Sequence, residues 1–121
     1  MELLTATSAL SALAHEGRLA AFRLLVRAGP DGLPAGEIAR RLGVRPNTLS
    51  ANLAILSQAG LVASRRDGRS IVYAAAFDRV AALMAFLAED CCGGAPEVCR
   101  PLAAVVARAA RCAPASPGDQ P

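Results

Sequence analysis

The fold is decided by the stretch Ala35-Gly36-Glu37-Ile38-Ala39-Arg40-Arg41-Leu42-Gly43 and by the run from Asn47 to Gly60 that follows it. The first segment predicts a short helix ending at Gly43, because glycine accepts the left-handed conformation that closes a helix. Asn47 is predicted to cap a second helix, which runs to about Ala59 and is closed by Gly60. Two short helices joined by a tight glycine-containing turn are typical of a helix-turn-helix.

A change of period follows this helix pair. The runs Val62–Arg66 and Arg69–Tyr73 are strand-like, and they flank the dipeptide Asp67-Gly68. Asp-Gly between two such runs predicts a β-hairpin, since the favoured two-residue turn needs positive φ. A hairpin after a helix-turn-helix, with arginines near its tip, is the arrangement called a wing.

Four further helices are predicted outside this region, from apolar spacing and the absence of breakers. The single histidine, His15, is expected to cap or span the junction between the first two. The predicted fold is mainly α with a small β-hairpin: a winged helix-turn-helix in the order α-α-α-α-β-β-α, with an added C-terminal helix. Residues 1–112 are expected to form the DNA-binding and dimerisation domain, and the Pro- and Ser-rich residues 113–121 a flexible tail. The four helices predicted outside the helix-turn-helix and the hairpin are Leu3–Ala14, Arg18–Ala28, Phe77–Cys92 (ended by Gly93-Gly94) and Pro96 to about Arg111.

The distribution of charge along the chain indicates what kind of molecule the protein binds. The chain carries a net +3, but residues 37–69 alone hold six arginines and two acids, a net +4. A local surplus of this kind suits a face that contacts phosphates. The other interpretation is an ordinary solvated basic face. The helix pair, the hairpin and the local charge surplus together favour DNA binding instead. Contacts with base edges are assigned to four residues early in the second helix, Asn47, Thr48, Ser50 and Asn52. Phosphate or groove contacts are assigned to Arg40, Arg41 and Arg45, and to Arg65, Arg66 and Arg69 on the wing.

Several motifs resemble the ArsR/SmtB family over about residues 3–92. They are the run from Leu10 to Leu19, Glu37-Ile38-Ala39, Leu49-Ser50 followed by Leu53 and Leu56, Ala59-Gly60-Leu61-Val62, and Arg66-Asp67-Gly68-Arg69 with Tyr73. This resemblance implies a dimeric winged helix-turn-helix repressor that metal or metalloid ions release from DNA. It also implies that Phe77, Val80, Met84 and Leu87 pack, with the first helix, against a partner subunit.

The cysteines carry the expected effector site. Cys91, Cys92 and Cys99 can converge on one soft ion, and a site made of thiolates selects against hard cations. An adjacent pair with a third cysteine resembles family members that sense As(III) at the end of the last long helix. Three thiolates complete the shell of As(III), whereas tetrahedral zinc takes a fourth ligand, which Cys112 would have to supply. We therefore expect As(III), or the related Sb(III), as the effector and no organic cofactor.

Two alternatives remain at this point. The same thiols could form a redox or persulfide sensor on the same fold. A small thiol enzyme is less favoured, because the chain has no C-x-x-C motif and no histidine near its thiols.

A cytoplasmic protein is expected. The longest apolar run, Val80 to Ala88, has nine residues, whereas a membrane span needs about 20. The N-terminus has no signal-peptide pattern. In a reducing compartment, cysteines indicate metal-binding or redox chemistry before disulfides.

Overall fold

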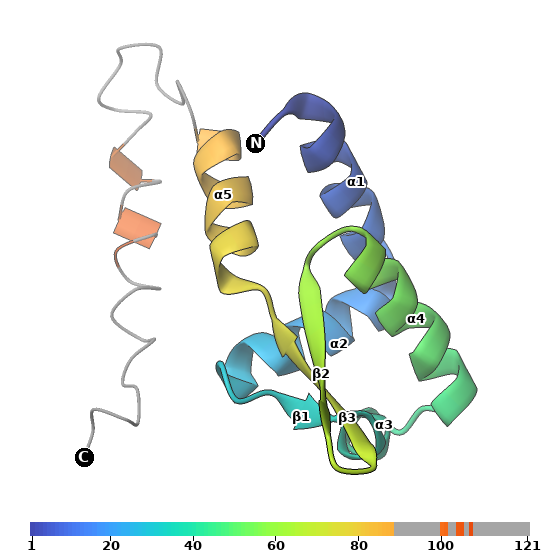
Figure 1. The fold of residues 1–121 in the computed structure, drawn as a ribbon. Helices are drawn as coiled ribbons and strands as arrows, with labels where there is room; N and C mark the ends of the chain where they lie inside the picture. The colour runs from blue at the N-terminus through green and yellow to red at the C-terminus, as the bar shows by residue number, and fades with distance from the viewer. Residues whose placement is uncertain (89–99, 102–103, 106, 108–121) are drawn as a thin grey trace, which may run out of the picture. The chain divides into compact units, whose positions relative to one another are not determined.

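The computed structural model describes residues 1–88, 100, 101, 104, 105 and 107. The chain divides into two compact units, Met1–Phe86 and Leu87–Pro121, and the first carries the helix-turn-helix (Figure 1). The described residues from 100 to 107 are helical, in agreement with the helix predicted from Pro96 to Arg111. The predicted end of the preceding helix at Gly93-Gly94 and the tail 113–121 lie outside the described residues. The elements in order are α1 (Leu3–Leu13), α2 (Glu16–Ala28), β1 (Leu33–Pro34), α3 (Ala35–Leu42), α4 (Pro46–Gln58), β2 (Val62–Asp67), β3 (Ser70–Ala75) and α5 (Phe77–Ala88).

The junction of α1 and α2 is closed by two side chains. Nδ1 of His15 accepts a hydrogen bond from the backbone N–H of Arg18 at 3.2 Å, which confirms the capping role expected for His15. Nε of Arg18 donates to the carbonyl oxygen of Ala12 at 2.6 Å, in the last turn of α1. The helix begins at Glu16, not at Arg18 as predicted, because a capped first turn with an acid at its start tolerates Gly17.

The helix-turn-helix consists of α3 and α4. Gly43 closes α3 with φ +67°, and the N–H of Val44 donates to the carbonyl of Ala39 at 3.1 Å. The prediction that Asn47 caps α4 is wrong. Pro46 occupies the first helical position, where its missing N–H costs no hydrogen bond, so the capping position falls on Arg45.

The core lies under α4. Leu49, Leu53 and Leu56 point inward at helical spacing and are at most 2% exposed. Each such leucine stabilises the fold by about 1.5–3 kcal/mol relative to an exposed one. Burial of this stripe determines which side of α4 remains outside. The largest fully buried side chains are Leu25, Ile38, Leu49, Leu53, Leu56 and Leu61.

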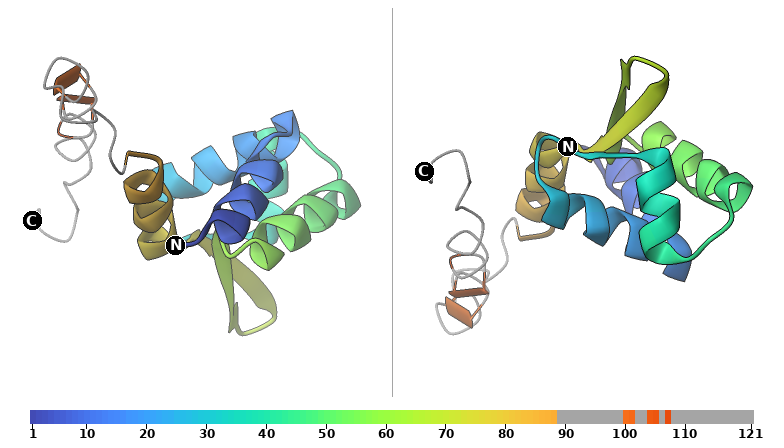
Figure 2. Two further views of the ribbon diagram at one scale, coloured as in Figure 1. Left: turned by 90° about the horizontal axis from the view of Figure 1, so that it is seen from above. Right: turned by 90° about the horizontal axis from the view of Figure 1, so that it is seen from below.

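The sheet has three antiparallel strands in the order β1-β3-β2, one more than the predicted hairpin. Leu33 and Pro34 of β1 pair with Tyr73 and Val72 of β3. A two-residue strand containing proline has no period to detect. The hairpin itself is confirmed, and Figure 2 shows it projecting away from the helices.

The turn of the hairpin differs from the prediction by one residue. Asp67 pairs with Ser70, so the two turn residues are Gly68 and Arg69 instead of Asp67 and Gly68. Gly68, at the first turn position, has φ +65°, and this register follows because glycine meets the positive-φ requirement there. Arg69 consequently lies at the tip of the wing.

Candidate DNA interface

The outer side of α4 carries most of the predicted base-reading residues. Asn47, Thr48 and Ser50 are exposed, while Leu49 between them is buried. Oδ1 of Asn47 accepts from the N–H of Thr48 at 3.0 Å, which holds the amide at the first turn. Arg45, directly before the helix, is also exposed. The early residues of a recognition helix are those that reach base edges, so this end of α4 is available to DNA.

Asn52 lies differently from the other three. It is half-buried, and its Nδ2 atom is 3.1 Å from the position that a Cβ on Gly17 would occupy. The Cε1 atom of His15 is 3.2 Å from the same point. Asn52 therefore faces the first turn of α2, and the contact of its amide with α2 was not foreseen from the sequence.

Two arginines at the end of α3 share one carboxylate. Arg40 donates through Nε to Oε1 of Glu37 at 3.1 Å and through Nη2 to Oε2. Arg41 donates through Nε to Oε2 at 2.7 Å. These hydrogen bonds, that from Arg40 first and then that from Arg41, lower the pKa of Glu37 to about 2. The spacings i,i+3 and i,i+4 on a predicted helix were a signal from which this pairing could have been anticipated.

The wing arginines are not equivalent. Nη2 of Arg65 donates to the backbone carbonyl of Asp31 at 3.1 Å, which ties β2 to the loop before β1. Arg65 pairs across the strands with Val72, and Arg66 pairs with Ile71. Successive side chains of a strand point to opposite faces, so Arg66 points away from the face that Arg65 anchors. Arg66 and Arg69 are both exposed.

We expect Arg69→Ala to weaken binding to all DNA sequences alike and to reduce the salt slope by about one phosphate contact. Arg65→Ala should weaken binding with a smaller change of slope, because the hydrogen bond to the carbonyl of Asp31 orients its guanidinium group toward the loop before β1. Fluorescence-anisotropy titrations over a series of salt concentrations measure both effects. Identical slopes for the two variants would contradict this division of roles.

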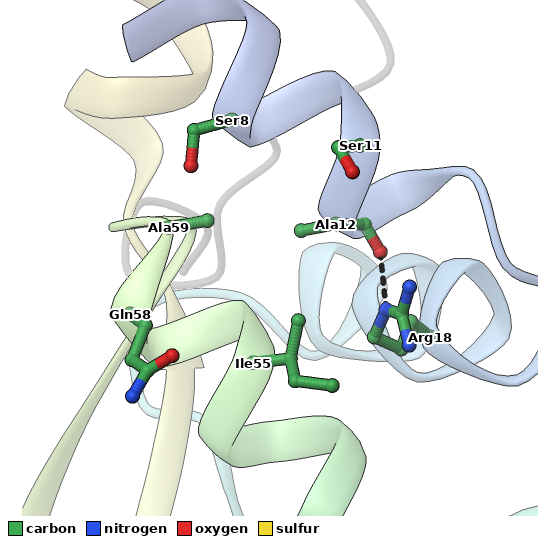
Figure 3. A pocket seen from close by; sticks show the side chains of 7 residues that line it. All are labelled: Ser8, Ser11, Ala12, Arg18, Ile55, Gln58 and Ala59. Carbon is green, nitrogen blue, oxygen red and sulfur yellow. Dashed lines mark hydrogen bonds between the residues drawn. The ribbon is translucent and has the colours of Figure 1, made fainter.

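A shallow hollow of about 200 Å³ lies between α1, α2 and α4 (Figure 3). Arg18 lies on its wall, hydrogen-bonded to the carbonyl of Ala12. The serines that line it have no histidine or carboxylate beside them, so the hollow contains no nucleophile with an adjacent base. Its lining residues are Ser8, Ser11, Ala12, Arg18, Ile55, Gln58 and Ala59.

The predicted thiol site lies outside the described residues, as do all four cysteines. Within the described part of the chain, no group of three or more His, Cys, Asp or Glu side chains is placed to hold a metal ion. Among these same residues, no helix is long and apolar enough to cross a membrane.

Comparisons with known proteins agree with this architecture. A family model described as a helix-turn-helix domain matches residues 13–65. The biofilm growth-associated repressor of Agrobacterium fabrum is 36% identical over 88 residues, covering 73% of this chain and 71% of that protein. An ArsR-like transcriptional regulator from Rhodococcus sp. RHA1 superposes with a TM-score of 0.65 at 28% identity, covering 89% of this chain and 95% of that one. The homodimeric winged helix-turn-helix domain of Mb0332 from Mycobacterium bovis, a possible ArsR-family regulator, superposes with a TM-score of 0.58 at 32% identity. The superposition covers 71% of this chain and 80% of that one.

The helix pair, the three-stranded sheet and the exposed basic side chains define a winged helix-turn-helix DNA-binding protein. The chain belongs to the ArsR family of transcriptional regulators. It is therefore a DNA-binding regulator and not an enzyme.

Proposed function

We propose that this protein is a homodimeric repressor that binds operator DNA and releases it when As(III), or the related Sb(III), binds Cys91, Cys92 and Cys99. The observation that carries the proposal is the distribution of thiols. Residues 1–90 contain no cysteine, and three of the four cysteines lie within the nine residues from 91 to 99. Repression is supported by the Agrobacterium relative, which is described as a repressor. Such a protein acts in the cytoplasm, where thiols stay reduced.

The chemistry of the thiols favours a trivalent metalloid. Thiolates bind soft acceptors, and three of them saturate As(III), which carries a lone pair. Zinc in a closed site takes four ligands. His15 already accepts a hydrogen bond from the backbone of Arg18 and therefore does not offer Nδ1 to a metal. These points support a three-thiolate site over a zinc site.

A homodimer is supported by exposed apolar side chains on two helices. On α1, Leu3 and Leu4 are 69% and 78% exposed, and on α5, Met84 and Leu87 are 51% and 56% exposed. Val80, expected with them at the interface, is half-buried against the core of its own subunit and could offer only the rest of its surface to a partner. The Mycobacterium relative is homodimeric. A second copy of the chain is the occupant that would cover these side chains.

The position of the thiols in the chain suggests how they could act on DNA. The helix α5 carries Met84 and is described as far as Ala88, and Cys91 follows three residues later in the sequence. Ion binding at that end of α5 would favour one arrangement of the dimer over another. Linkage then requires that operator DNA weaken metalloid binding by the same factor by which the metalloid weakens DNA binding.

An electrophoretic mobility titration tests this function. The protein on its operator is titrated in parallel with As(III), Sb(III), Zn²⁺, peroxide and sulfide. We expect release by As(III) and Sb(III) at concentrations at which the other three leave the complex intact. Release by peroxide or sulfide alone, with a matching mass change at the cysteines, would identify the redox or persulfide sensor instead. Release by Zn²⁺ alone would contradict the three-thiolate site.

A further inference from the structure

The carboxylate of Glu37 lies beneath two guanidinium groups of the helix-turn-helix. The side chains of Arg40 and Arg41 are 70% and 47% exposed, whereas that of Glu37 is 27% exposed. The acid is thus the inner member of the trio and the arginines are the outer members. Both arginines are among those assigned to phosphate contacts.

The hydrogen-bond pattern leaves part of each guanidinium group free for other partners. Arg40 uses Nε and Nη2 on Glu37, and Arg41 uses Nε. A guanidinium group has five N–H donors, so both arginines keep donors that can reach a phosphate without leaving Glu37. The net charge of the trio is +1 in place of the +2 of two free arginines. Because the pKa of Glu37 is lowered to about 2, this neutralisation persists at neutral and mildly acidic pH.

We propose that Glu37 is a positioning residue that limits the sequence-independent attraction of α3 to DNA. It holds Arg40 and Arg41 in one orientation and offsets half of their charge. Non-specific affinity is set almost entirely by phosphate neutralisation, while sequence is read at base edges. Weakening the phosphate contribution at α3 therefore lowers the affinity for every DNA sequence alike and leaves discrimination between sequences to the base-edge contacts. The proposal rests on the placement of α3 at the DNA interface and is independent of the identity of the effector.

A purely structural role for Glu37 is the alternative explanation of this arrangement. Ion pairs exposed to solvent contribute little to the free energy of folding. A purely structural Glu37 therefore predicts that its removal changes neither DNA affinity nor its salt dependence. The two roles differ in a quantity that can be measured, the slope of log K against log salt concentration.

The test compares Glu37→Gln with the unchanged full-length protein on random duplex DNA and on operator DNA between about 50 and 200 mM salt. Glutamine keeps the shape of the side chain and removes its charge. We expect the slope on random DNA to steepen by about one unit, since the variant gains one positive charge at α3 and each added phosphate contact contributes about 0.9. Random-DNA affinity at low salt should rise about tenfold, and operator affinity should rise by a similar factor. The matched control is Glu2→Gln, which makes the same charge change at the N-terminus, at the opposite end of the unit from α3 (Figure 1), and should leave the slope unchanged.

A second set of variants separates the possible failures. In Arg40→Ala/Arg41→Ala the salt slope should flatten. Adding Glu37→Gln to that pair should change neither the slope nor the affinity for random DNA. The proposal is overturned if Glu37→Gln still raises the affinity for random DNA in the triple variant. It is also overturned if the slope of Glu37→Gln equals that of Glu2→Gln. An Arg40→Ala/Arg41→Ala slope equal to that of the unchanged protein shows instead that α3 does not contact DNA and overturns the placement on which the proposal rests. Circular dichroism melting of each variant verifies that the fold is intact.

Discussion

Serine at position 91, 92 or 99 is expected to abolish most of the As(III) response while leaving operator affinity near that of the unchanged protein. The three thiolates share one ion, and each must lose its proton to bind. Two remaining thiolates leave the shell of As(III) incomplete, so a single substitution should cost most of the affinity. The DNA interface is expected to be unaffected, because Cys91, Cys92 and Cys99 lie outside residues 37–69, which carry the net +4. Mobility titrations of Cys91→Ser, Cys92→Ser and Cys99→Ser with As(III) measure both quantities.

The remaining cysteine provides the control. Cys112→Ser should respond to As(III) like the unchanged protein, since a three-coordinate ion needs no fourth thiolate. An As(III) response that survives the triple substitution at 91, 92 and 99 would contradict the proposed site. A response abolished by Cys112→Ser alone would do so as well, and would favour a four-coordinate ion.

Gly32→Ala is expected to lower the free energy of unfolding by about 2–4 kcal/mol, from backbone strain and overpacking together. Gly32 has φ +71°, and a Cβ on it would lie 2.2 Å from the carbonyl oxygen of Tyr73, which is backbone of β3. Relief of that contact requires β1 and β3 to separate, and β3 is one arm of the wing. Thermal unfolding followed by circular dichroism should therefore show a melting point lower by about 10 °C or more.

Gly43→Ala is the matched control for this substitution. Gly43 has a similar φ of +67°, but a Cβ there would meet no atom within 4 Å. Its replacement should cost about 1–2 kcal/mol, the penalty of the left-handed conformation alone. Equal destabilisation by Gly32→Ala and Gly43→Ala would show that the contact with Tyr73 is relieved without cost.

Local signals determined the family, the helix pair and the hairpin. The short helix closed by Gly43 and the two strand-like runs around Asp67-Gly68 are visible as patterns in the sequence. These features depend on the periods of 3.6 and 2 and on residues that accept positive φ, all of which are properties of neighbours in sequence. The cysteine cluster is likewise visible in the sequence, although it lies outside the described residues.

The tertiary structure decided which groups of the candidate interface are already bound. The pairing of β1 with β3 and the hydrogen bond from Arg65 to the carbonyl of Asp31 join residues more than 30 positions apart. Asn52 was assigned to base reading from its position in the helix, but it faces Gly17 because α4 packs against α2. Such pairings depend on how separate elements pack around a shared core. Residue types and spacing along the chain do not reveal such pairings, so the sequence identified the basic face without showing that Arg65 is hydrogen-bonded to the loop before β1 and that Asn52 faces α2.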